Sequence, residues 1–233
     1  MKYFSLYSGG KDSTACASYL DERGELAGVV ALDTGISVPD WMPFIERTAN
    51  ERGWNLEVYK TPANYDDLVL KYGFPGPGLH GMFMNYLKGR CIRAFKKKHK
   101  GDVLASGVRQ QESARRAIGT KEWSVFEGVK VWAPIFDWST PDVWKYIRAK
   151  GFERSPAYQT LCISGDCLCG AFATKMERAA IGAFYPCVMD RLKALEAKVG
   201  HEWGWGANRR PRGVKVEVGP VCVDCDSKNI EVA

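Results

Sequence analysis

The 233-residue sequence contains no apolar run long enough to cross a lipid bilayer, and its first residues lack the form of a secretion signal. Repeats and low-complexity tracts are also missing. The composition, 45% hydrophobic and 26% charged, is that of a folded globular chain. These features argue against a membrane protein, an exported protein and a disordered protein. We therefore expect a cytoplasmic protein, with no membrane partner, that is long enough to bury a sizeable core.

Two familiar phosphate-binding motifs are absent from the start of the chain. Residues 8–13 read Ser-Gly-Gly-Lys-Asp-Ser, which fits neither the Walker A spacing G-x-x-x-x-G-K-[ST] nor the dinucleotide fingerprint G-x-G-x-x-G. The context is nevertheless typical of an anion site, because a β-prone run at residues 2–7 precedes the glycines and a helical pattern follows. This order directs backbone N–H groups and a helix dipole at a phosphate. The alternative is an ordinary turn in which glycine only permits a tight bend.

The first half of the sequence alternates strand and helix signals, which predicts an α/β fold with a doubly wound, mostly parallel sheet. Residues 26–32, Leu-Ala-Gly-Val-Val-Ala-Leu, form the continuous apolar run of a buried parallel strand. A later helix is expected to have Thr140 as its N-cap and Gly151 as its C-cap. After Gly151 the composition becomes rich in cysteine and glycine. We expect a nucleotide-binding domain at residues 1–150 and a small Cys-rich module with a tail at residues 151–233.

Acidic residues are absent between Met84 and Gly101, although the whole chain has a net charge of only +6. Such a run is most often a solvated helix face. The alternative is a surface that gathers an anionic acceptor, either a nucleic acid or a sulfonucleotide. The run contains seven cations: Lys88, Arg90, Arg93, Lys96, Lys97, Lys98 and Lys100.

The three histidines show no metal-ligand spacing, so cysteines are the candidate metal ligands. With no export signal, the eight cysteines are expected to be reduced rather than paired in disulfides. The segment LCISGDCLCGAF places three of them close together, and a fourth follows a short helix. Clustered thiolates of this kind suit Zn²⁺ or an iron–sulfur cluster, and the alternative is a set of unliganded thiols. The candidate ligands are Cys162, Cys167, Cys169 and Cys187.

The fourth metal ligand stays open at this point. Cys187 is nearest in sequence, and the Cys222-x-x-Cys225 pair could instead complete a Cys₄ zinc site with Cys167 and Cys169 or form a redox dithiol. Cys16, which lies between two alanines on the first expected helix, is assigned to the core.

The six residues from Ser8 to Ser13 resemble the PP-loop of the ATP pyrophosphatase (adenine nucleotide alpha-hydrolase-like) superfamily, whose pattern is S-G-G-x-D-S. Enzymes with this loop cleave ATP between the α- and β-phosphates and adenylate a substrate oxygen. The resemblance implies that Gly9 and Gly10 close around a pyrophosphate while the two serines add hydroxyl donors. It also implies that Lys11 supplies a cation.

The next residue of the loop, Asp12, is expected to hold Mg²⁺ or to orient the loop.

Further segments follow in the order of the phosphoadenosine phosphosulfate (PAPS) reductase family. Asp33, in the Asp-Thr-Gly that closes the second expected strand, lies where a doubly wound sheet places its ligand. Residues 107–116, GVRQQESARR, are similar to the family segment G-x-R-x-x-E-S-x-x-R.

This similarity implies that Gly107, Arg109 and Arg116 belong to the nucleotide site, with the arginines gripping phosphate or sulfate oxygens. The alternative for the arginines is structural ion pairing with Glu112. Residues 134–144 are similar to the family stretch P-I-x-x-W…D-V-W, and we assign them to packing and capping.

The sequence departs from the sulfonucleotide reductases in keeping the full ATP-type loop and in lacking a histidine near its C-terminal cysteines. We therefore expect a transferase-type enzyme of sulfur metabolism that binds Mg²⁺-ATP and adenylates a substrate, with Lys11, Asp12 and Arg109 as catalytic residues. The resemblance favours a [4Fe–4S] cluster over Zn²⁺. It also implies Cys91 as an alternative fourth ligand, because this position resembles a cluster cysteine of the adenylylsulfate reductases, which have a Cys-Cys pair there. One alternative is a reductase that releases sulfite from PAPS or adenylylsulfate. Another is a nucleotide-sensing or nucleic-acid-binding module without turnover. The sequence identifies neither the acceptor nor the sulfur donor.

Overall fold

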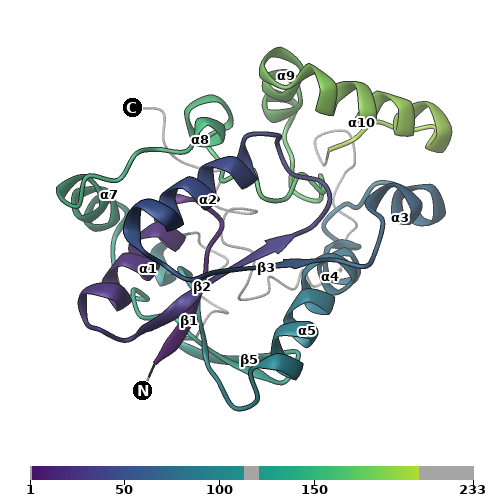
Figure 1. The fold of residues 1–233 in the computed structure, drawn as a ribbon. Coiled ribbons are helices and arrows are strands. Elements are labelled where there is room, and N and C mark those ends of the chain that lie inside the picture. The colour runs from purple at the N-terminus through teal and green to yellow at the C-terminus, as the bar shows by residue number, and fades with distance from the viewer. Residues whose placement is uncertain (1, 113–120, 205–233) are drawn as a thin grey trace.

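The computed structural model describes residues 2–112 and 121–204 of the chain, and it contains a six-stranded sheet (Figure 1). The strand order is β3-β2-β1-β4-β6-β5. The strands β1, β2, β3, β4 and β6 run parallel, and β5 pairs antiparallel with β6 at one edge. This arrangement confirms the predicted α/β fold with a mostly parallel sheet. The strands are β1 (Tyr3–Leu6), β2 (Leu26–Asp33), β3 (Leu56–Lys60), β4 (Leu104–Ala105), β5 (Trp123–Phe126) and β6 (Val129–Trp132).

Helices cover both faces of the sheet. Successive side chains of a strand point to opposite faces, so neighbouring strand residues pack against different helices. On β2, Val30 belongs to a buried cluster with Phe95 of α5, whereas Val29 belongs to a cluster with Ile45 of α2. None of the described helices has both the length and the apolar character needed to cross a bilayer. The helices are α1 (Lys11–Glu22), α2 (Trp41–Arg52), α3 (Tyr65–Tyr72), α4 (His80–Met84), the π-helical η1 (Asn85–Gly89), α5 (Arg90–Lys98), the 3₁₀-helical η2 (Gln110–Glu112), α7 (Thr140–Ala149), α8 (Pro156–Leu161), α9 (Lys175–Phe184) and α10 (Pro186–Val199).

The start of α7 corrects the predicted cap by one residue. Ser139, not Thr140, is the N-cap, because its side chain accepts a hydrogen bond from the Asp142 amide while the Asp142 carboxylate accepts one from the Ser139 amide. This reciprocal capping box needs an acid three residues after the cap, and only Ser139 has one. The helix ends at Ala149, with Lys150 as its C-cap and Gly151 one residue further on, at a φ of +66°.

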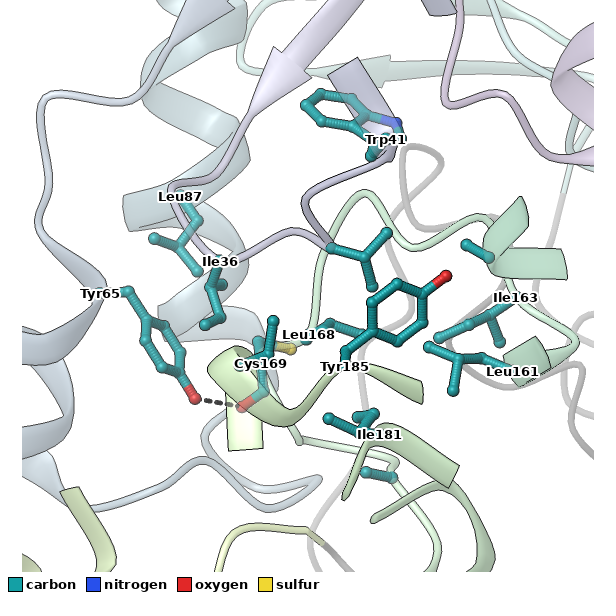
Figure 2. Packing of buried hydrophobic residues seen from close by; sticks show 14 of the residues in the cluster. Ile36, Trp41, Tyr65, Leu87, Leu161, Ile163, Leu168, Cys169, Ile181 and Tyr185 are labelled. Carbon is teal, nitrogen blue, oxygen red and sulfur yellow. Dashed lines mark hydrogen bonds between the residues drawn. The ribbon is translucent and has the colours of Figure 1, made fainter. Parts of the chain in front are cut away.

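The buried core extends across residue 150. One cluster contains Tyr7 and Ile36 from the first half together with Leu168, Tyr185 and Trp203 from the second. Figure 2 shows part of this packing, with Leu168 beside Ile36. Within the described ranges, the segment after residue 150 therefore packs onto the sheet domain. Its existence as a separate Cys-rich module stays a prediction.

Candidate active site

The turn between β1 and α1 lies at the carboxyl end of β1, and its geometry requires glycine at position 9. Gly9 has a φ of +75°, in the left-handed region, and a Cβ atom there would lie 3.0 Å from Cγ2 of Ile45. Gly10 is the N-cap of α1. The N–H groups in the first turn of a helix have no acceptors within that helix, so a helix start such as that of α1 is a common type of anion site.

The two serines hold this loop closed. The Ser8 amide donates to Oγ of Ser13 over 3.2 Å, and Ser13 Oγ donates to the Gly10 carbonyl oxygen over 2.9 Å. From outside the loop, Nε1 of Trp41 donates to the Ser8 carbonyl oxygen over 2.9 Å. Sequence reasoning did not identify Trp41, because no local pattern indicates which indole reaches the loop.

Asp12 and Arg109 form a buried ion pair. Nε of Arg109 donates to Oδ1 of Asp12 over 2.7 Å, and both side chains are almost completely buried. The guanidinium group also donates to the carbonyl oxygen of Trp138 and to Oγ1 of Thr140. The predicted arginine is therefore bound to Asp12, and its predicted alternative of ion pairing with Glu112 stays untested. Its contact with a phosphate or sulfate stays a prediction.

The loop after β4 lies directly against the start of α1. A Cβ atom on Gly107 would lie 2.5 Å from the carbonyl carbon of Asp12 and 2.8 Å from the Ser13 nitrogen. Only glycine permits backbone approach at this distance. Because β1 and β4 are neighbours while β2 lies on the other side of β1, this is the point where the strand order reverses. Open α/β sheets bind their ligands at such a point.

Lys11 lies between the loop and the segment after residue 150. Its ammonium nitrogen is 3.2 Å from Oδ2 of Asp12 and 5.9 Å from the ring centroid of Tyr158 on α8. The Asp12 carboxylate thus faces two cations, Lys11 and Arg109. Both roles predicted for Asp12, holding Mg²⁺ and orienting the loop, stay predictions.

Asp33 and Arg116 are the remaining predicted nucleotide residues. Oδ1 of Asp33 accepts a hydrogen bond from the Gly35 amide over 2.9 Å and so shapes the turn after β2. Arg116 lies outside the described residues.

The cysteine-containing loop is fixed to the segment that follows β2. The Val38 amide donates to the Gly165 carbonyl oxygen over 3.0 Å, and the Leu168 amide donates to the Ile36 carbonyl oxygen over 2.7 Å. In Figure 2, Tyr65 points to the carbonyl oxygen of Cys169, to which its hydroxyl donates over 3.0 Å. The loop therefore lies at the carboxyl end of the sheet, on the same edge as residues 8–13.

A buried ion pair anchors the same loop to η1. Nζ of Lys88, from η1, is 2.9 Å from Oδ2 of Asp166, and both side chains are largely buried. Asp166 is held further, because its Oδ1 accepts from Oγ of Ser164 and its carbonyl oxygen accepts from Oγ1 of Thr34. Sequence reasoning placed Lys88 in a basic run and missed its partner, which is 78 residues away.

Cys167 and Cys169 are adjacent within this loop. A hydrogen bond from Cys169 lowers the pKa of the Cys167 thiol to about 6, with a further contribution from the Lys88 ammonium, against the opposing effect of burial. Cys169 is buried and Cys167 is partly exposed. The structure thus brings these two predicted ligands together.

The other cysteines lie elsewhere. Cys162 and Cys187 are exposed, whereas Cys16 is fully buried, which confirms its assignment to the core. Cys91 is buried in the cluster on the α5 face, and burial raises its pKa to about 12. In residues 2–112 and 121–204, no three Cys, His, Asp or Glu side chains form a group that could hold a metal ion.

These side chains therefore supply one thiol pair but not the ligand set of a [4Fe–4S] cluster or a Zn²⁺ site. Cys222 and Cys225, the alternative ligands, lie outside the described residues. The metal cofactor stays a prediction.

The structure divides the predicted basic run between the two ends of the sheet. Lys88 lies near the carboxyl end, but α5 runs back toward the amino end, where the His99 ring lies 4.3 Å from that of Phe4 on β1. Arg93 and Lys98 are paired with Glu127 and Glu57. Most of the run therefore lies away from residues 8–13, because a helix that connects parallel strands must cross the sheet in the opposite direction.

The family model of the phosphoadenosine phosphosulfate reductase domain matches residues 2–170. Adenosine 5'-phosphosulfate reductase of Allochromatium vinosum is 29% identical over 140 residues, which cover 56% of this chain and 52% of that protein. Sulfate adenylyltransferase subunit 2 of Bacteroides thetaiotaomicron is 26% identical over 188 residues, which cover 66% of this chain and 59% of that protein.

A solved structure of phosphoadenylyl-sulfate (PAPS) reductase from Candida auris, in a phosphate complex, is similar with a TM-score of 0.51. The similarity covers 67% of this chain and 76% of that chain at 14% sequence identity, and it shows a shared fold. The chain spans about half the length of the curated relatives that it matches.

Proposed function

Since the chain belongs to the phosphoadenosine phosphosulfate reductase domain family, we propose that it is an enzyme that cleaves ATP between its α- and β-phosphates and adenylates a substrate for sulfur transfer. One observation carries this proposal. The loop of residues 8–13 and Gly107 meet at the carboxyl ends of β1 and β4, with the first turn of α1 and Lys11 at the same place. A relative whose name states adenylyl transfer, the sulfate adenylyltransferase subunit, supports the same class of reaction.

Each part of the loop has a distinct task in this reaction. The amides at the start of α1 and the helix dipole would bind the phosphate tail of ATP. The Lys11 ammonium would offset negative charge that develops on the departing pyrophosphate. Asp12, held by Arg109, would keep the first turn of α1 in register with the loop after β4. Arg109 acts here as a positioning residue, because its guanidinium group is bound to protein atoms.

The chemistry is a displacement at phosphorus. A substrate oxygen attacks the α-phosphorus, the bond from that phosphorus to the bridging oxygen breaks, and pyrophosphate leaves with the electron pair. The adenylated oxygen then departs readily when a sulfur nucleophile attacks. Mg²⁺, arriving with ATP, would neutralise part of the phosphate charge.

Turnover of ATP tests this proposal. We expect AMP and pyrophosphate to form from Mg²⁺-ATP, and Lys11→Gln to reduce the rate by about a hundredfold or more, as loss of one charge-stabilising group does in other enzymes. Lys97→Gln is the matched control, because Lys97 is exposed on α5 away from the loop. ATP binding without any product, unchanged by Lys11→Gln, would instead indicate a nucleotide-sensing module.

Sulfonucleotide reduction is the second candidate function. It is supported by the adenylylsulfate reductase relative and by the thiol pair at the edge of the sheet that carries residues 8–13. This reaction would release sulfite from PAPS or adenylylsulfate in the presence of a thiol reductant. Sulfite from a sulfonucleotide with no pyrophosphate from ATP would favour it over adenylation.

A further inference from the structure

We propose that Cys167 and Cys169 form a reversible dithiol–disulfide couple. This inference goes beyond the proposed function, because it assigns a two-electron redox site to the protein whether or not ATP is cleaved. The couple would exchange with disulfides and dithiols, either small molecules or exposed groups of another protein.

The first argument is the contact between the two thiols. Only Leu168 separates them in sequence, and the Cys169 thiol forms a hydrogen bond with the Cys167 sulfur. Their exposures also differ, since Cys167 is partly exposed and Cys169 is buried. An external disulfide can therefore reach Cys167 first, and Cys169 is placed to attack the mixed disulfide that results.

The second argument is that the backbone around the pair is fixed. The Leu168 amide donates to the Ile36 carbonyl oxygen, and the Leu168 carbonyl oxygen accepts from Nε1 of Trp203 over 3.0 Å. The Cys169 carbonyl oxygen accepts from the Tyr65 hydroxyl. These bonds, from three separate segments, keep the two side chains together without depending on the pair itself.

The third argument is the anchoring of the residue next to Cys167. Asp166 is held by the Lys88 ammonium over 2.9 Å from a largely buried position, which fixes the start of the pair. By contrast, Cys16 is fully enclosed, and its sulfur accepts a hydrogen bond from Ser5.

The exchange is balanced as follows. The Cys167 sulfur attacks one sulfur of an external disulfide R–S–S–R, whose S–S bond breaks and releases one R–SH. The Cys169 sulfur then attacks the Cys167 sulfur, the mixed disulfide breaks, and a second R–SH leaves. The two protons of the cysteine thiols end on the two R–SH molecules. The protein pair is oxidised by two electrons and the external disulfide is reduced by two.

Peptide mapping of the full-length chain tests the couple without using a nucleotide. The reduced protein is incubated with oxidised glutathione, alkylated and digested. We expect a Cys167–Cys169 disulfide that dithiothreitol reverses. In Cys169→Ser the intramolecular disulfide should be absent, and glutathione should stay on Cys167. Cys162→Ser, which changes an exposed thiol, is the matched control and should leave the disulfide unchanged.

Two results would overturn the inference. One is that both thiols of the wild-type protein stay fully alkylatable while the exposed Cys162 acquires glutathione. The other is that anaerobically purified protein contains zinc or iron that protects both thiols until a chelator removes it. Neither result depends on ATP turnover, so the couple can fail while the proposed function stands, and the reverse also holds. The wild-type map answers the question even if a variant does not fold.

Discussion

Nε of Arg109 lies 2.7 Å from Oδ1 of Asp12, although 97 residues separate them in the sequence. The pair joins the loop after β4 to the first turn of α1. Both side chains are almost completely buried, so removing Asp12 takes from Arg109 the carboxylate that it contacts, and removing Arg109 leaves Asp12 with Lys11 as its neighbouring cation. The pair therefore couples the stability of the fold to the shape of the candidate active site.

Arg109→Met should lower the free energy of unfolding by about 3–5 kcal/mol, as expected when one member of a buried ion pair is removed. Urea denaturation measures this change. The double variant Arg109→Met with Asp12→Asn should lose less than the sum of the two single variants, because neither member of the pair is then buried without the other. Additive losses would show that the two residues do not interact.

Gly107→Ala should lower ATP affinity about tenfold or more, equivalent to at least about 1.4 kcal/mol. The new Cβ atom would lie 2.5 Å from the Asp12 carbonyl carbon, so the loop after β4 must move away from α1. Titration calorimetry with ATP measures the effect. Gly76→Ala is the control, since a Cβ atom there meets nothing within 4 Å. Equal affinities in both variants would contradict the close approach.

Trp41→Phe should weaken ATP binding, because it removes the indole that donates to the Ser8 carbonyl oxygen and fixes the loop. Trp54→Phe is a matched control that also loses one indole hydrogen bond, to Oδ2 of Asp21. Both variants should lose about 1 kcal/mol of stability. Only Trp41→Phe should change ATP affinity in fluorescence or calorimetric titrations, and an equal change in both would remove the special role of Trp41.

Glu57 should stabilise the protein above about pH 4.5 and lose this contribution as the pH falls through about 2. Burial opposes its ionisation, but hydrogen bonds from Tyr59, His99 and Lys98 outweigh that effect and lower its pKa to about 2. A carboxyl group whose pKa is lowered by folding is protonated more easily in the unfolded chain. Its stabilising effect is therefore complete above the unfolded pKa and absent below the folded one.

Unfolding free energies measured across this pH range check the prediction. Glu57→Gln should cost about 2 kcal/mol at pH 7 and close to nothing near pH 2. Glu153→Gln is the control, because that side chain is 76% exposed and pairs with Arg47 at the surface. A cost for Glu57→Gln that does not depend on pH would show that lost packing, and not the charge, is responsible.

The sequence was sufficient to predict those features that are encoded in neighbouring residues. The glycine-rich turn between a strand and a helix is encoded in consecutive residues, and the apolar run at residues 26–32 indicates a buried strand without reference to any partner. The capping box at Ser139 and Asp142 is equally local, although two adjacent residues that can both cap a helix led to an error of one position.

Contacts between distant residues could not be obtained in this way. Arg109 carries no local sign that its partner is Asp12, and Lys88 looks like any other cation of a basic run. The four candidate metal ligands do not form one group, because Cys162 is exposed just after α8 and Cys187 is exposed on α10, while Cys167 and Cys169 share one fixed loop.

The sequence by itself determined the alternation of strands and helices in the first half of the chain, the glycine-rich turn at residues 8–13 and the family, because these depend on neighbouring residues and their spacing. Only the tertiary structure decided which charges are buried together and which cysteines touch. Burial removes water from a charge or a thiol, and its chemistry then depends on the atoms that replace the water. Those atoms come from segments that are remote in the chain.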